Sequence, residues 1–354
     1  MNPTASEIIY QVTAQYPDRR FNIFDVQAQE TPAGIVLSGR VLEERQRVAL
    51  RAAFAEMKAG TPLDVSAVRV LTKGARRMAV AASLTHLQAQ PAWIGETWNQ
   101  LLAGQMLDVL EEHGRWALVR QDDGYLGYAY LPYLTSAAPL PATHIVIGPL
   151  ALLRAAPGGR GIGRIFGGTQ VTLMTGASDP SINARDPESS EVHVSVFAPE
   201  GEPEAAQIPG GWLPSNALRA LNALPASSEM RRQQMMLDAP ALIGTPYLWG
   251  GVSASGIDCS GFAQLLHRWV GIDLPRDADL QFRAARPVEP PYRPGDLLFF
   301  AEPGDARSIT HVAVSTGGWG IIHSSRRING VNFDDVQAVP LLRDTFAGAR
   351  TFLD

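Results

Sequence analysis

The stretch Gly256-Ile257-Asp258-Cys259-Ser260-Gly261-Phe262 decides how the last third of the chain folds. An apolar run with helical spacing follows it, which predicts a helix over residues 259–270. Asp258 stands at the N-cap position, where a carboxylate accepts hydrogen bonds from the free amides of the first turn. Cys259 then lies in that first turn, and Gly261 lets another chain segment or a substrate approach it closely.

Cys259 is the single cysteine among 354 residues, which excludes an internal disulfide and a multi-thiolate zinc site. A lone cysteine is commonly a buried apolar side chain. Here the free amides and the positive end of the helix favour a thiolate, and such sites lower a cysteine pKa from about 8.5. We therefore expect Cys259 to be a nucleophile with a lowered pKa.

A thiol nucleophile needs an imidazole partner, and two histidines fit that role. His267 lies eight residues beyond Cys259 on the same helix, about 12 Å away along the axis, which is too far. His311 and His323 fall on adjacent strands of an expected hairpin, at positions that share one face. The pattern predicts a triad in which His311 is the general base and His323 orients it. The alternative is that both are hydrogen-bonded residues of the sheet.

The C-terminal domain, residues 227–354, is predicted to be α+β. Helices are expected over 227–242 and 259–270, with a glycine-rich loop at 250–256 between them. An antiparallel sheet should follow, with strands at 296–301, 310–315 and 320–325.

Residues 1–75 predict a small α/β domain in the order helix, strand, strand, helix, strand, a pattern that resembles a BON-like domain. The second helix, over 42–58, is expected to be amphipathic, with Leu42, Val48, Ala52 and Ala55 near helical spacing. Residues 76–142 and 143–222 read as short strands and turns, and each resembles a bacterial SH3-like β-barrel. The two units look like a diverged tandem repeat.

The charge balance argues against nucleic acid as a partner, because the net charge is -5, the pI is about 5.8 and no basic patch is present. No apolar run approaches the ~20 residues of a membrane helix, so no membrane insertion is expected. The N-terminus has no secretory signal, which favours a cytoplasmic protein unless a leader has been removed. We expect a monomer without cofactor or metal.

Six short blocks in order resemble the NlpC family of papain-like cysteine peptidases over residues 227–354. They are Tyr247-Leu248-Trp249-Gly250-Gly251, residues 256–262, Leu274-Pro275-Arg276-Asp277, residues 294–300, Thr310-His311-Val312-Ala313 and Ile322-His323-Ser324. With two SH3-like units upstream, the resemblance implies a γ-D-glutamyl-L-diamino-acid endopeptidase acting on peptidoglycan stem peptides. It implies that Cys259 attacks the γ-amide carbonyl while His311 exchanges the proton.

The resemblance also implies substrate-binding residues within the peptidase domain. Tyr247 and Trp249 would line the pocket, unless they are core aromatics. Asp258 would accept the free amine of L-Ala, and Ser260 would bind the D-Glu portion. The turn Arg276-Asp277 completes this set: Arg276 suits a carboxylate, although a surface ion pair with Asp277 is the alternative.

In such enzymes the first barrel supplies a Glu and a Tyr to the substrate amine, and Glu96 with Tyr128 or Tyr125 are the candidates here. Carboxylates enclosing that amine would make a free N-terminal L-Ala a requirement, with discrimination of ~10³-fold or more against intact glycan-linked stems. The protein would then recycle released peptides. The alternatives are a wall-degrading hydrolase, a non-catalytic cell-wall binding protein, and acyl transfer onto lipid, which calls for a membrane-facing apolar segment.

Overall fold

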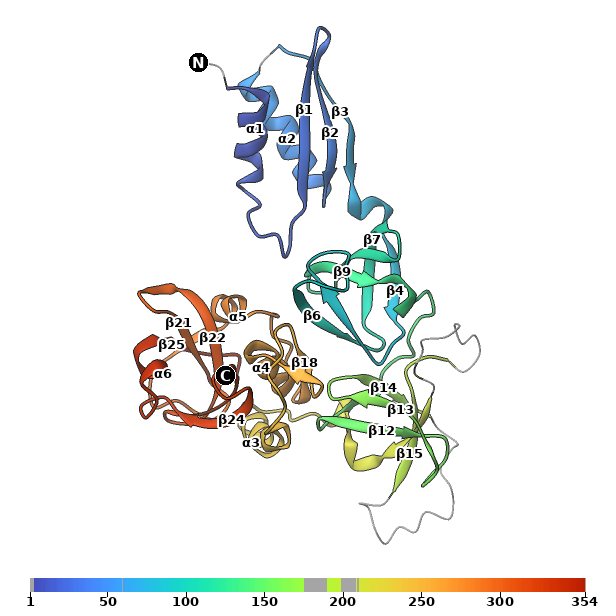
Figure 1. Cartoon of the computed structure of the whole chain (residues 1–354), viewed down its shortest axis with the longest axis vertical. Helices are drawn as coiled ribbons and strands as arrows, with labels where there is room; N and C mark the ends of the chain where they lie inside the picture. The colour runs from blue at the N-terminus through green and yellow to red at the C-terminus, as the bar shows by residue number, and fades with distance from the viewer. Residues whose placement is uncertain (1–2, 59, 175–189, 199–207, 209, 354) are drawn as a thin grey trace. The chain divides into compact units, whose positions relative to one another are not determined.

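The computed structural model describes residues 3–58, 60–174, 190–198, 208 and 210–353 (Figure 1). The chain divides into two compact units of mixed α and β structure. One unit comprises residues 1–78, 90–92 and 106–131, and the other comprises residues 79–89, 93–105 and 132–354.

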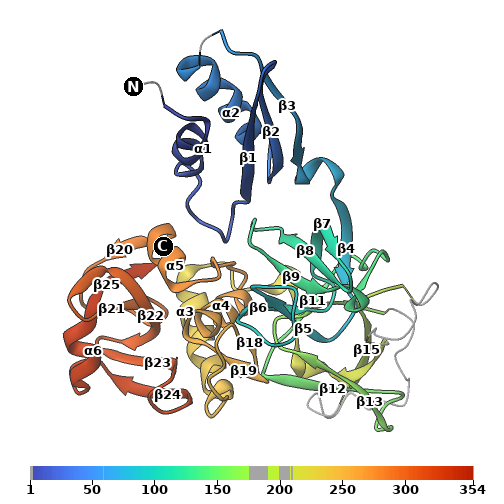
Figure 2. The same ribbon diagram turned by 45° about the horizontal axis from the view of Figure 1, so that its top comes forward.

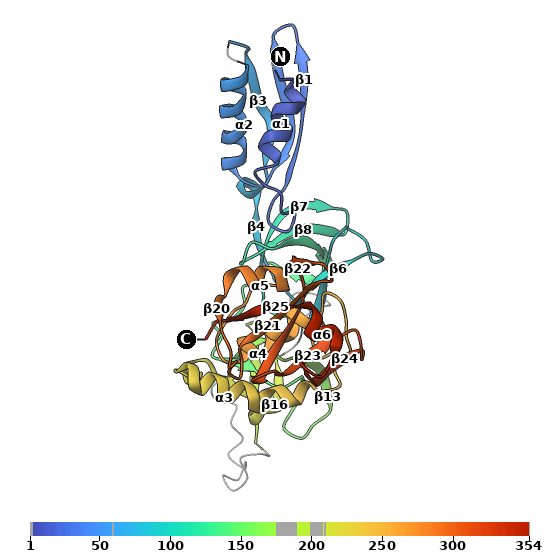
Figure 3. The ribbon, with the colours of Figure 1, turned by 90° about the vertical axis from the view of Figure 1, so that its left-hand side faces the viewer.

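The N-terminal segment has the predicted element order: α1 (Ala5–Thr13), β1 (Phe24–Thr31), β2 (Gly34–Val41), α2 (Glu44–Met57) and β3 (Leu63–Val70). Strand β2 pairs antiparallel with β1 and parallel with β3. Both helices cover one face of this sheet (Figure 3). Leu42 of the predicted apolar face is buried, but Val48 is 54% exposed, and Leu50 and Phe54 are the buried apolar residues of α2 instead. The larger apolar side chains, one helical turn apart, set the phase.

The same unit contains an antiparallel meander of β7 (Met106–His113), β8 (Trp116–Gln121) and β9 (Leu126–Tyr130). Glu111 of β7 forms ion pairs with Arg40 and Arg69 of the N-terminal sheet. A leucine cluster lies beside this network, made of Leu42, Leu71, Leu110, Leu118 and Leu126. The α/β segment and the meander therefore meet in this small leucine cluster, which is separate from the core between the two helices and the sheet. The BON-like resemblance stays a prediction.

The second unit begins with two strand pairs. β4 (Arg76–Val80) pairs through Ala79 and Val80 with β10 (Leu134–Thr135), and β5 (Leu84–Gln88) pairs with β6 (Thr97–Leu102). A seven-stranded sheet follows, in the order β13-β12-β16-β15-β14-β11-β17. Its strands are β11 (His144–Val146), β12 (Leu150–Arg154), β13 (Gly161–Phe166), β14 (Gln170–Leu173), β15 (Glu191–Ser195), β16 (Gly211–Pro214) and β17 (Leu218–Ala220). Residues 175–189 and 199–207 of the second predicted barrel lie outside the described residues.

The C-terminal domain is helical first and then antiparallel, as predicted. Its helices are α3 (Ser228–Asp238), α4 (Cys259–Trp269), α5 (Ala278–Ala284) and α6 (Pro340–Thr345), with the short pair β18 (Val252–Ser253) and β19 (Gly256–Ile257) before α4. The sheet order is β20-β25-β21-β22-β23-β24. The strands are β20 (Arg286–Val288), β21 (Leu297–Glu302), β22 (Asp305–Gly317), β23 (Gly320–Ser325), β24 (Gly330–Asp335) and β25 (Phe346–Thr351).

This sheet has a core on each face. Phe299, Val312 and Ile322 point toward α4, and Phe262 and Trp269 of α4 are fully buried against them. Alternate residues such as Phe300 and Ala313 point to the other face, which α6 covers. Figure 2 shows the strands between α6 and the group α3, α4 and α5. Burial on both faces fixes the register of β22 and β23, which carry the two histidines.

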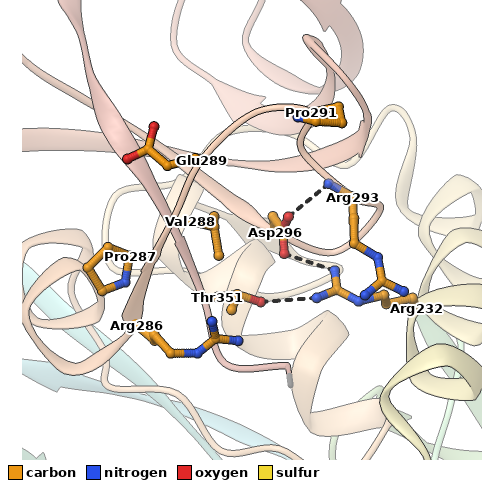
Figure 4. Close-up of a pocket in the computed structure, with 9 residues that line it drawn as sticks. All are labelled: Arg232, Arg286, Pro287, Val288, Glu289, Pro291, Arg293, Asp296 and Thr351. Atoms are coloured by element: carbon orange, nitrogen blue, oxygen red, sulfur yellow. Dashed lines mark hydrogen bonds and ion pairs between the residues drawn. The ribbon is translucent and has the colours of Figure 1, made fainter.

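A buried ion pair joins α3 to β21. Arg232 donates to Asp296 Oδ1 at 2.8 Å, and both side chains are 4% exposed (Figure 4). Arg232 also donates to the carbonyl of Pro294 at 2.7 Å. The pair borders a pocket of about 310 Å³ with Arg286 and Arg293 on its wall. Asp296 neutralises the buried charge of Arg232. Because Arg232 lies in α3 and Asp296 directly precedes β21, their ion pair holds this helix against the sheet.

His267 of α4 makes stability depend on pH. It is fully buried, and burial lowers its pKa from 6.5 to about 4 although Nδ1 lies 2.8 Å from the Ala263 carbonyl. The unfolded chain therefore binds the extra proton between pH 6.5 and 4, and about 2–3 kcal/mol of stability present above pH 6.5 is lost as pH falls through that window. Urea unfolding at pH 7.5 and 4.5 should show a smaller loss in His267→Gln than in the wild type. An identical loss in both proteins would contradict this assignment.

Candidate active site

The glycine-rich loop closes over the head of helix α4 as the sequence predicted. Asp258 Oδ1 accepts the Gly261 amide at 2.7 Å, which confirms the N-cap, and Oδ2 accepts the Gly250 amide at 2.9 Å. Gly250 has φ +79°, and a Cβ there would lie 2.4 Å from the Thr97 carbonyl. A Cβ on Gly261 would lie 2.1 Å from the Gly251 carbonyl. Both positions therefore require glycine, so that the loop can reach the thiol.

Cys259 lies in the first turn of α4 and is 6% exposed. The backbone amides of Val312 and Ser260 act to lower the pKa of this thiol. Burial raises the pKa of Cys259 to about 12, and the Asp258 carboxylate acts in the same direction, against the smaller effect of the two amides. The predicted lowering of this pKa was wrong, because desolvation and the adjacent carboxylate outweigh the helix end. The resting thiol carries its proton.

A hydrogen-bonded chain runs from His311 through His323 to Asp334. His311 Nε2 lies 2.7 Å from His323 Nδ1, and His323 Nε2 lies 3.0 Å from Asp334 Oδ2. Burial opposes ionisation of Asp334, but hydrogen bonds from His323 and Arg327 outweigh it and lower its pKa. The carboxylate thus accepts the Nε2 proton of His323, and neutral His323 accepts at Nδ1 from His311. This order leaves a lone pair on Nδ1 of His311.

Both histidines are neutral at neutral pH. Burial lowers the pKa of His311 to about 3, with a further contribution from His323. Burial also lowers the pKa of His323, although Asp334 works against it. His311 directly precedes Val312, whose backbone amide acts to lower the pKa of the Cys259 thiol. The described contacts join His311, His323 and Asp334, while the approach of His311 to the Cys259 sulfur stays a prediction.

Asp334 escaped the sequence analysis because strand β24 was not predicted. In the register of the hairpin, His323 faces Asn332 and Ile321 faces Asp334, so residues 332 and 334 alternate onto the histidine side. The segment Asn332-Phe333-Asp334-Asp335 is poor in strand-forming residues. An acidic residue two positions from the partner of His323 was the available signal.

Arg276 is a buried side chain that hydrogen-bonds to residues of β6 and of the head of α4. It is 1% exposed, so its guanidinium does not lie at the surface, and a pairing with Asp277 stays an alternative. Its guanidinium donates to Asp258 at 2.6 and 3.1 Å, to Ser260 Oγ at 2.9 Å and to Asn99 Oδ1 at 2.7 Å. Arg276 thereby neutralises Asp258 and positions Ser260. Asp277 is the N-cap residue of α5 and is half-buried, and substrate contacts of all these residues stay predictions.

The segment around β6 contributes three polar side chains to the loop. Glu96 accepts from Trp249 Nε1 at 3.0 Å, so the predicted Glu96 does lie beside the predicted aromatic. Gln100 Oε1 accepts from the Val252 amide at 2.9 Å and from Ser253 Oγ at 2.8 Å. Asn99 and Gln100 were not among the predicted site residues. Two amides within a buried strand were the signal, because buried polar groups need partners.

The two predicted aromatic residues stand at the rim of the loop. Trp249 is 49% exposed and Tyr247 is half-buried, so the core-aromatic alternative is wrong for Trp249. The Arg326 guanidinium lies 4.9 Å from the Trp249 ring centre and 5.4 Å from that of Tyr247. Burial raises the pKa of Tyr247 to about 12, with a contribution from Cys259, which places the phenol near the sulfur.

The tyrosine candidates from the first predicted barrel belong to the other compact unit. Tyr128 contacts the ring of His113 with centres 5.5 Å apart, and Tyr125 is 2% exposed and packs against Phe21. A role for either in substrate binding stays a prediction. Within the described part of the chain, no group of three or more His, Cys, Asp or Glu side chains could hold a metal, and no helix could span a membrane.

Residues 244–350 match the model of the NlpC/P60 family. The γ-D-glutamyl-L-lysine dipeptidyl-peptidase of Bacillus cereus is 28% identical over 274 residues, which are 72% of this chain and 75% of that protein. Dipeptidyl-peptidase 6 of Lysinibacillus sphaericus is 28% identical over 279 residues, 76% of this chain and 95% of its own.

Among solved structures, an NlpC/P60 family protein from Bacillus cereus shares the fold. Its TM-score is 0.62 at 21% identity, over 79% of this chain and 100% of that one. The matched residues 244–350 include Cys259, His311, His323 and Asp334. The chain therefore carries a domain of the NlpC/P60 family.

Proposed function

We propose that this protein is a cysteine peptidase that hydrolyses the γ-D-glutamyl–L-diamino-acid bond of peptidoglycan stem peptides. The observation that carries the proposal is the hydrogen-bonded chain of His311, His323 and Asp334, in an NlpC/P60 domain that also holds Cys259 in the first turn of α4. The name of the Bacillus cereus relative, a γ-D-glutamyl-L-lysine dipeptidyl-peptidase, supports the substrate class.

In the proposed reaction, the Cys259 thiol attacks the γ-carbonyl carbon of D-Glu while Nδ1 of His311 takes the thiol proton. The tetrahedral intermediate then collapses, the C–N bond breaks, and the imidazolium of His311 returns the proton to the leaving amine. Water next attacks the thioester through the same base and releases the γ-carboxylate. A neutral resting pair suits this route because the proton moves only as the new C–S bond forms.

The upstream sheets and the catalytic domain fit the proposed architecture of two SH3-like barrels before a papain-like peptidase. The likeness to the Bacillus cereus structure extends over 79% of the chain, well beyond the peptidase domain. The residues of β6 beside the loop, Glu96, Asn99 and Gln100, support a wall of the cleft formed by the first of these sheets.

The amine end of the substrate is proposed to approach Asp258 and Glu96. Asp258 already pairs with Arg276, and Glu96 is exposed and hydrated. Neither carboxylate is both buried and unpaired without substrate, so the expected selectivity for a free amine is about 10–100-fold, smaller than the ~10³-fold expected from sequence.

Turnover of L-Ala-γ-D-Glu-diamino acid, of its N-acetylated form and of purified sacculi tests this function. We expect mass spectrometry to find L-Ala-γ-D-Glu and free diamino acid from the first substrate, with kcat/KM about 10–100-fold above the acetylated form. Cys259→Ala serves as the blank for each substrate.

Similar rates on all three substrates would instead favour a wall-degrading hydrolase acting on intact stems. No cleavage of any substrate, with peptides retained on the protein, would favour a non-catalytic binding protein.

A further inference from the structure

A second pocket of about 470 Å³ lies between helix α5 and the first part of strand β22. Its lining residues are Asp279, Phe282, Arg283, Arg307, Ser308 and Ile309. Neither the family match nor the sequence analysis gives this pocket a role. It lies within the NlpC/P60 domain, on two elements that pack directly against each other.

Both elements also contact the head of α4. Gln281 of α5 donates to the carbonyl of Ser260 at 3.1 Å, and the Val312 amide of β22 acts to lower the pKa of the Cys259 thiol. Ile309 precedes Val312 by three residues, which is about 10 Å of strand at most. The pocket is therefore within reach of a substrate group a few bonds beyond the scissile amide.

The charges of the pocket favour an anion. Arg283 pairs with Asp279, so these two residues compensate each other. Arg307 is exposed, and the described residues offer its guanidinium no hydrogen-bond or ion-pair partner. The Arg350 guanidinium lies 4.0 Å from the ring centre of the lining residue Phe282, but Arg350 itself does not line the pocket. The lining therefore holds two guanidinium groups, those of Arg283 and Arg307, and one carboxylate, that of Asp279, which leaves the pocket with a net positive charge.

The leaving group of the proposed reaction carries a distinguishing charge at its far end. L-Lysine ends in an ammonium alone, whereas diaminopimelate ends in an ammonium and a carboxylate, about 6 Å beyond the scissile nitrogen. A cationic pocket repels the first and can pair with the second through the planar guanidinium fork.

We propose that this pocket binds the distal end of a diaminopimelate residue and that Arg307 pairs with its carboxylate. The inference rests on the proposed function and narrows it to diamino acids with a second carboxylate. The expected diamino acid thus differs from the lysine in the name of the Bacillus cereus relative.

Three tripeptides test the pocket: L-Ala-γ-D-Glu followed by meso-diaminopimelate, by its distal carboxamide, or by L-lysine. We expect the wild type to prefer the first over the other two by about 10-fold in kcat/KM. Arg307→Ala should reduce that preference to about 1, and Arg307→Lys should retain part of it. Arg343→Ala, an exposed arginine of α6 paired with its neighbour Asp344, is the matched control and should keep the full preference.

The outcomes separate the pocket from the reaction. Equal kcat/KM for the three peptides in the wild type, or an unchanged preference in Arg307→Ala, would overturn the pocket assignment and leave the peptidase proposal standing. Absence of cleavage of all three would overturn the proposed function and the pocket assignment with it. Thermal melting of each variant confirms that the exposed substitutions leave the fold intact.

Discussion

Cys259→Ala is expected to lower kcat by ~10⁴-fold or more, because no other thiol is present to form the acyl intermediate. Cys259→Ser should be nearly as inactive. A hydroxyl holds its proton more tightly than a thiol, and the buried, carboxylate-flanked position already disfavours an anion. Steady-state hydrolysis of L-Ala-γ-D-Glu-diamino acid measures both effects.

The loss must be chemical rather than structural. The replacement removes a single sulfur from a site at the head of α4, so the melting temperature should change little beside the loss of activity. The thiol should react slowly with iodoacetamide in the substrate-free protein at pH 7, because it is buried and protonated. Full turnover by Cys259→Ala would remove the nucleophile assignment.

The second large effect concerns the base. His311→Ala should lower kcat by about 10³–10⁴-fold, His323→Ala by about 10²-fold and Asp334→Asn by about 10-fold. The order follows from the hydrogen-bonded chain: His311 exchanges the proton, His323 fixes its tautomer, and Asp334 fixes that of His323.

The pH profile separates this positioning from a merely structural role. If His323 is protonated, its Nδ1 becomes a donor and His311 can no longer keep its lone pair toward the thiol. Because burial lowers the pKa of His323, wild-type kcat should persist below pH 6.5 and fall only as the pH drops through that lowered value. His323→Ala should lack this acid limb. Equal losses in all three variants with an unchanged profile would count against the chain.

The catalytic domain was the most predictable part of the fold. The N-cap, the apolar spacing and the glycine-rich turns located α4 to within one residue, and the hairpin strand at 320–325 was placed to the residue. Helix α3 ends at Asp238 rather than continuing to residue 242, because Pro240 converts the last residues into a 3-10 turn. Strand β22 begins five residues earlier than predicted, since its polar start at Asp305 gives no strand signal.

The site was predictable where chemistry is local and unpredictable where it depends on burial. A helix end next to Asp258 signals an activated thiol, but the free energy of desolvating Cys259 depends on β22 and the loop that cover it. The same limit applies to Arg276. Its sequence allowed a surface ion pair, but the side chain is buried, and one of its hydrogen-bond partners is Asn99, 177 residues away.

The contacts of β6 imply an order of events as the polypeptide leaves the ribosome. Asn99 and Gln100 supply acceptors for Arg276 and for the Val252 amide, and they are synthesised 177 and 152 residues before these partners. Because domains form vectorially from the N-terminus, the strand is available as a template when the loop emerges. A catalytic fragment started at residue 227 would meet water at those donors instead, and its cleft would open and close more freely. Grafting this peptidase onto another scaffold therefore requires carrying β6 along with it.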